Sequence, residues 1–96
     1  MSEAEIERRE QGSKGSYVLS LPDGTSELSF SILSPSLVIA DHTSVPDALR
    51  GQGIADRLAG AIAADARAQG FKIVPLCPFV NAWRQKNADW ADVFQV

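Results

Sequence analysis

The sequence predicts a single α/β domain, residues 1–96, in which helices pack on a mixed sheet. Three observations indicate this class. Apolar and polar residues alternate through much of the first half of the chain, which is typical of half-buried strands. From Ile54 onward apolar residues recur at helical spacing instead. A chain of 96 residues fits one domain, because domains of about 100–150 residues are the commonest.

The first half predicts antiparallel hairpins. Residues 6–11 could form a short polar edge strand, and residues 11–15 form a loop by composition. Residues 17–21 and 28–32 each alternate apolar with mostly small polar side chains. Between them, residues 22–25 read Pro-Asp-Gly-Thr, where proline presets φ, aspartate bonds locally and glycine tolerates positive φ. These two strands therefore form a hairpin.

A strand–helix–strand unit follows. Residues 37–40 are continuously apolar and suit a central strand that continues toward Val45. An alanine-rich helix starts at Ile54, and Gly70 is typical of its C-cap. Residues 71–76 form the next strand, so the unit should be a right-handed parallel crossover.

The end of the chain predicts a second helix. Cys77-Pro78 should open it, because proline is favoured in a first helical turn. The tail, residues 87–96, supplies further packing residues. The side chains expected in the core from this part of the chain are Phe79, Val80, Trp83, Trp90 and Phe94.

Charge and cysteine content exclude several classes of protein. Nine basic and twelve acidic residues give a net charge of −3, so no basic excess indicates a nucleic-acid partner. One cysteine and one histidine support neither a disulfide nor a metal site. No apolar run approaches the roughly 20 residues that span a bilayer, and the acidic N-terminus is unlike a signal peptide. We therefore expect a cytoplasmic protein without membrane or nucleic-acid partners.

A glycine-containing loop at the strand–helix junction carries the chemistry. Residues 50–55 read Arg-Gly-Gln-Gly-Ile-Ala. The glycines allow close backbone approach, and the first amides of the helix point outward with a partial positive charge. Such a loop favours a phosphate or diphosphate, although a glycine-rich loop before a helix is often only a tight turn. It lacks the P-loop lysine, and Asp56 stands where a dinucleotide fingerprint has glycine, which disfavours a nucleotide hydrolase or a dinucleotide oxidoreductase.

Residues 45–55 resemble the coenzyme A signature of the GNAT acetyltransferase superfamily, with Arg50, Gly53 and Ala55 at matching positions. The order of His42-Thr43, this loop, a Cys-Pro-Phe motif within residues 74–80 and an aromatic tail is similar to small stand-alone N-acetyltransferase domain-containing proteins. The resemblance implies a minimal GNAT-like (acyl-CoA N-acyltransferase) fold that transfers an acetyl group from acetyl-CoA to an amine or protein acceptor. The cofactor-binding residues that it implies are Val45, Arg50, Gly51, Gln52, Gly53, Ile54, Ala55 and Asn81.

The resemblance also gives roles to individual residues. The pantetheine arm would run between the strand ending near Val45 and the strand ending near Leu76, and a backbone N–H near Val45 would polarise the thioester carbonyl. Asn81 would bond the pantetheine amides or is a surface residue. Trp83 stands where the family usually has tyrosine, and an indole cannot deliver a proton as a phenol can. The acetyl group would then pass directly from the thioester to the amine.

Cys77 and His42 are the candidate catalytic residues. Cys77 precedes a helix start, where a thiol can have a lowered pKa and act as a nucleophile or acetyl acceptor; a buried apolar cysteine is the alternative. His42 could be a general base, or a structural histidine. Asp41 should point to the opposite face of the strand from His42, so the two form no dyad.

Three functions remain open on the sequence. The first is the acetyltransferase. The second is a non-catalytic acyl-CoA binding module or sensor that needs a partner, because residues 11–15 offer only a loop where larger members build an acceptor site. The third is a phosphate-binding fold unrelated to coenzyme A. We expect a monomer or a weak homodimer.

Overall fold

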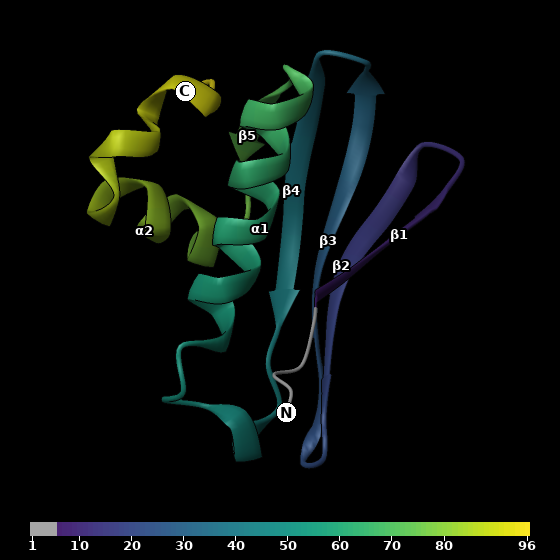
Figure 1. Ribbon diagram of the computed structural model, residues 1–96, viewed down its shortest axis with the longest axis vertical. Coiled ribbons are helices and arrows are strands. Elements are labelled where there is room, and N and C mark those ends of the chain that lie inside the picture. Colours follow the sequence, from purple (N-terminus) through teal and green to yellow (C-terminus); the bar gives the residue numbers. More distant parts are fainter. Residues whose placement is uncertain (1–5) are drawn as a thin grey trace.

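The computed structural model describes residues 6–96, which form one five-stranded sheet in the order β1-β2-β3-β4-β5, with two α-helices beside it (Figure 1). The strands are β1 (Ile6–Gln11), β2 (Lys14–Leu21), β3 (Gly24–Ser34), β4 (Leu37–Ser44) and β5 (Lys72–Pro75). The helices are η1 (Asp47–Leu49), α1 (Ile54–Gln69), α2 (Pro78–Lys86) and η2 (Ala88–Val93), of which η1 and η2 are 3-10 helices. The predicted mixed α/β class is confirmed.

The hairpins form as predicted, with tighter turns. The three pairs β1–β2, β2–β3 and β3–β4 are antiparallel. The edge strand over residues 6–11 is confirmed, because β1 spans those residues. The expected loop over residues 11–15 is too long, because β2 begins at Lys14. Gly12, at φ +65°, allows this two-residue connection, since few other residues adopt that conformation at low cost.

The parallel pairing of the two strands of the crossover is also confirmed. β5 pairs with β4 in parallel, from Leu37 opposite Lys72 to Ala40 opposite Pro75. Helix α1 connects them and ends at Gly70, which has φ +84° and donates its N–H to the carbonyl of Ala66. This is the left-handed glycine cap that the sequence indicates.

The core lies between one face of the sheet and α1. Alternate side chains of the strands point inward, and α1 packs on β2, β3 and β5. Helix α2 contacts α1 and lies on the same side of the sheet (Figure 1). Val80 and Trp83 anchor α2 in the core, as predicted. The prediction for Phe79 is wrong, because its side chain is 53% exposed.

A β-bulge interrupts β4. Ala40 lies opposite Phe30, but His42 lies opposite Ser29, so Asp41 is the extra residue. Before the bulge the even-numbered Val38 and Ala40 are buried, whereas after it the odd-numbered Thr43 is buried. Asp41 and His42 therefore share the outer face of the sheet, and the prediction that they face opposite ways is wrong.

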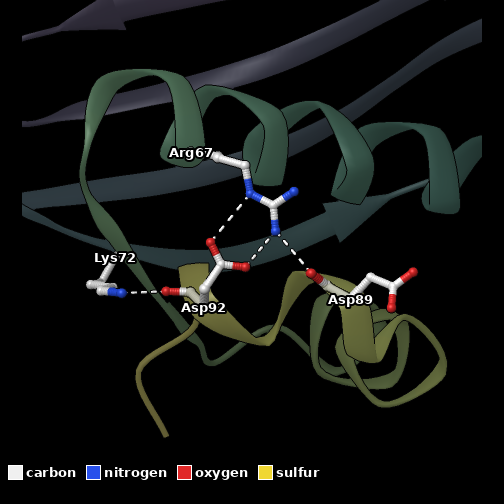
Figure 2. A network of polar contacts seen from close by, with 4 residues as sticks. All are labelled: Arg67, Lys72, Asp89 and Asp92. Carbon is white, nitrogen blue, oxygen red and sulfur yellow. Dashed lines mark hydrogen bonds and ion pairs between the residues drawn. The ribbon is translucent and has the colours of Figure 1, made fainter.

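The C-terminal segment packs against β5 and α1. Phe94 pairs with Ile73 as a parallel bridge, and the Gln95 N–H donates to the Ile73 carbonyl at 2.8 Å. Figure 2 shows Arg67 of α1 between the Asp92 carboxylate and the Asp89 carbonyl, with the Lys72 amine on the Asp92 carbonyl. These contacts fasten η2 to the domain. Within residues 6–96, no helix is long and apolar enough to cross a membrane.

Candidate functional site

Strands β4 and β5 separate after Ala40. The parallel ladder ends there, opposite Pro75, while β4 continues to Ser44 beside β3. The Cys77 N–H donates to the Ala40 carbonyl at 2.8 Å, and the chain then turns into α2. One edge of the last part of β4 therefore extends beyond its parallel neighbour, and extended chain along such an edge can pair with a ligand's amide groups.

A cavity of about 740 Å³ opens beside this end of β4. It lies between the end of β4, the following loop, the N-terminus of α1 and one side of α2. Its lining residues are His42, Thr43, Ser44, Val45, Leu49, Arg50, Gly51, Gly53, Ile54, Ala55, Asp56, Phe79 and Lys86. Apolar side chains and a few charged groups thus converge on one concave site, which is typical of a binding site for a small molecule.

The loop before α1 has the backbone that an anion cradle needs. Gly51 and Gly53 have φ values of +81° and +73°, which side-chain-bearing residues adopt only with strain. Gly53 is the N-cap of α1, and its carbonyl accepts the N–H of Arg57 at 3.1 Å. Because the next residues, Ile54 to Asp56, also line the cavity, the open end of a 16-residue helix faces it. The dipole of that helix favours negative charge there.

Two cationic side chains line the cavity, and each has an acidic neighbour. Arg50 Nε lies 3.1 Å from Asp47 Oδ1, with both side chains more than 70% exposed. Lys86 Nζ lies 3.9 Å from Asp56 Oδ1, with side chains 65% and 59% exposed. Exposed pairs such as these contribute little to stability, so both cations can change partners at small cost.

Cys77 lies one side chain away from the cavity. It is fully buried, and its Sγ is 3.1 Å from Oγ1 of Thr43, which does line the cavity. Its backbone position, just before α2 with Pro78 in the first turn, agrees with the sequence prediction. The thiol is therefore packed against the wall of the site.

His42 lies on the cavity itself, at the bulge. Its side chain is exposed, and its backbone carbonyl accepts the hydroxyl of Ser29 at 3.3 Å. The neighbouring Asp41 carboxylate accepts the hydroxyl of Ser31 at 2.6 Å. Asp41 is thus held by β3, and the exposed side chain of His42 lies on the same outer face of the sheet.

The structure brings most of the expected cofactor residues together. Val45, Arg50, Gly51, Gly53, Ile54 and Ala55 all line the cavity. Two do not. Gln52 donates from Nε2 to the Ala48 carbonyl at 3.4 Å, and the Asn81 side-chain oxygen accepts Arg84 Nε at 2.7 Å.

Sequence reasoning did not assign several of the lining residues to the site, above all Phe79, which it placed in the core, and Lys86, which it treated mainly as a solvated residue. They stand seven positions apart on α2, and residues at that spacing lie on the same face of a helix. This spacing was the available signal. The spacing shows that Phe79 and Lys86 share one face of α2. It does not show that this face lies beside the loop before α1.

Two parallel strands that separate beside the N-terminus of a helix offer a site suited to an elongated anionic ligand. Residues 16–93 match the family described as GCN5-related N-acetyl-transferase. The chain belongs to this family, and the resemblance to GNAT proteins is confirmed.

The fold is also similar to that of a solved structure. The solution NMR structure of a GCN5-like protein from Staphylococcus aureus, described as a candidate N-acetyltransferase, is similar with a TM-score of 0.70 and 27% sequence identity. The similarity covers 99% of this chain and 91% of that one, so it extends over the whole fold. A comparison with curated proteins gives no match.

Proposed function

We propose that the protein is an N-acetyltransferase that moves an acetyl group from acetyl-CoA to an amine. The observation that carries the proposal is the cavity that joins the free edge of β4 to the glycine loop before α1. Support comes from the family match over residues 16–93. We place the reaction in the cytoplasm, where a lone thiol such as Cys77 stays reduced.

The cavity offers matching groups for the parts of such a cosubstrate. Backbone amides of residues 50–55 would hold the diphosphate, with Arg50 adding a charge-assisted contact. The backbone of residues 42–45 would pair with the two amides of the pantetheine arm, as a neighbouring strand does. The Val45 N–H would then donate to the thioester carbonyl oxygen, where negative charge develops during transfer.

Direct transfer best suits these residues. The amine nitrogen bonds to the carbonyl carbon, the carbon–sulfur bond breaks, and coenzyme A leaves as the thiolate. His42 accepts the proton that the amine gives up, because histidine is the commonest general base in proteins and His42 is among the residues that line the cavity. The departing thiolate then takes up a proton. In the alternative route, Cys77 would carry the acetyl group transiently, but its burial against Thr43 opposes this role.

A thermal shift assay tests the proposed cosubstrate. Acetyl-CoA should raise the melting temperature, because a ligand that binds only the folded state stabilises it. The double variant Arg50→Glu/Gly53→Trp should lose that shift. No shift at millimolar acetyl-CoA, or an equal shift from ATP or inorganic phosphate, would remove the support for a coenzyme A site.

A non-catalytic acyl-CoA binding module is the second candidate. It is favoured by the β1–β2 connection, where only Gly12 and Ser13 separate the strands and nothing builds an acceptor site of the kind that the resemblance implies for larger members. Acetyl transfer to any member of a broad amine and peptide panel would exclude it. Tight binding of coenzyme A with no transfer across that panel would favour it over the enzyme.

A further inference from the structure

We propose that Lys86 is a switchable contact for the diphosphate of the cosubstrate, and that Asp56 competes with the diphosphate for it. The inference rests on the proposed function, because the proposed function identifies the ligand. It adds a specificity-determining pair that lies outside the coenzyme A signature of residues 45–55, lines the cavity and joins α1 to α2.

The position of Lys86 follows from α2. Phe79 in the first turn and Lys86 at the last residue lie on one stripe of the helix, and both line the cavity. The buried Trp83 stands four residues after Phe79 and three before Lys86, so it lies on the same side of α2 between them. Together with the buried Val80 it fixes the orientation of the helix against the core. The Lys86 amine is therefore carried to the N-terminus of α1, where it meets Asp56.

Asp56 stands in the first turn of α1, beside the amides that would hold the diphosphate. Its carboxylate has the same sign of charge as the ligand, and two like charges close together repel each other. At 3.9 Å between Lys86 Nζ and Asp56 Oδ1, with both side chains mostly exposed, the pair is loose. A diphosphate offers more negative charge and more acceptor oxygens than one carboxylate, so Lys86 gains by changing partner.

The exchange predicts opposite effects for the two residues. Lys86→Gln should weaken binding, because a charge-assisted contact is lost. Asp56→Asn should strengthen binding, because it releases Lys86 and removes a repulsive charge. The two effects should not add, since part of the Asp56 effect acts through Lys86.

Calorimetric titration tests this with three probes: coenzyme A, dephospho-CoA and pantetheine. Lys86→Gln should raise the Kd for coenzyme A and for dephospho-CoA by about three- to tenfold and leave the Kd for pantetheine, which has no phosphate, unchanged. Asp56→Asn should lower the first two Kd values by about two- to fivefold, and by less in the Lys86→Gln background. Lys14→Gln, the same substitution in the β1–β2 hairpin at the other end of the sheet (Figure 1), is the matched control and should change none of them.

Each other result overturns the inference. If Lys86→Gln behaves like Lys14→Gln while the natural protein binds coenzyme A, Lys86 makes no contact and the proposed function stands alone. If Lys86→Gln weakens the binding of coenzyme A but not of dephospho-CoA, Lys86 contacts the 3′-phosphate and not the diphosphate. If Lys86→Gln also weakens the binding of pantetheine, the substitution changes the cavity in general and not a phosphate contact. If the natural protein binds none of the probes, the proposed function falls together with the inference.

Discussion

The hydroxyl of Thr43 lies 3.1 Å from the thiol sulfur of Cys77, and both side chains are buried. Thr43 is near the end of β4 and Cys77 is the residue before α2. Together with the bond from the Cys77 N–H to the Ala40 carbonyl, this contact ties the two elements together just beyond the point where β4 and β5 separate. One wall of the cavity is therefore held by packing and hydrogen bonds inside the core.

Cys77→Ala should lower the free energy of unfolding by about 1–2 kcal/mol, because it leaves a small void and an unpartnered Thr43 hydroxyl. Cys77→Ser keeps a partner for Thr43 and should lose less. Chemical denaturation measures both. Both variants should keep acetyl transfer to a true substrate. A folded protein that loses transfer in both would show instead that the thiol carries the acetyl group.

Gly53→Ala and Gly12→Ala form a matched pair. Both glycines have positive φ, +73° and +65°, and an added Cβ meets no atom within 4 Å at either position. Each substitution should therefore cost a similar stability, about 1 kcal/mol, from backbone strain alone. Only Gly53 lines the cavity, so only Gly53→Ala should reduce the thermal shift caused by acetyl-CoA. Equal reductions in the two variants would place the ligand elsewhere.

Tyr17 should give the protein a pH dependence in the alkaline range. Burial, followed by the hydrogen bond to the Asp65 carboxylate at 2.8 Å, raises the pKa of the Tyr17 phenol well above its usual range. The stabilisation is fully present below the unfolded pKa of about 10 and is lost as the pH rises above it. Tyr17→Phe should cost about 1 kcal/mol at neutral pH, and its stability should fall less steeply above pH 10.

The chain has a single tyrosine, so absorbance at alkaline pH reports Tyr17 alone. The native protein should show no phenolate signal until it unfolds. A phenolate that forms near pH 10 in the folded protein would contradict the buried hydrogen bond.

Asp92 should contribute stability that acid removes. The hydrogen bond from Arg67 holds the pKa of the Asp92 carboxyl below its usual range (Figure 2). A lowered pKa contributes stability above the unfolded value of about 3.9, and this contribution is lost as the pH falls through the folded value. Asp92→Asn should therefore have a lower melting temperature than the natural protein at pH 7, and the difference should shrink toward pH 3. Asp23→Asn, in the β2–β3 turn, is the control and should show no such trend.

Periodicity predicted β2, β3 and α1. The two-residue period of β2 and β3 and the helical period of α1 reflect burial on one face, which sequence records directly. The bulge at Asp41 leaves no such record, because the inward pattern of Val38 and Ala40 simply continues to His42 when one counts by two. The extra residue appears only when β4 is paired with β3.

The candidate site also has one part that could be predicted from the sequence and one part that could not. The loop over residues 50–55 could be predicted because its glycines and the helix behind them are local features. Lys86 could not, because a lysine at a helix end is usually a solvated residue. Its place beside Asp56 depends on how α2 crosses α1, which is set by the packing of Trp83 and Val80 in the core.

Amide NMR during titration with acetyl-CoA tests the proposed site most directly. The proposal predicts shifts that saturate at amides of residues 42–45 and 50–56 and on the Phe79–Lys86 face of α2, with the β1–β2 hairpin unchanged. Amides that do not move at millimolar acetyl-CoA, or that move mainly outside the cavity, would contradict it.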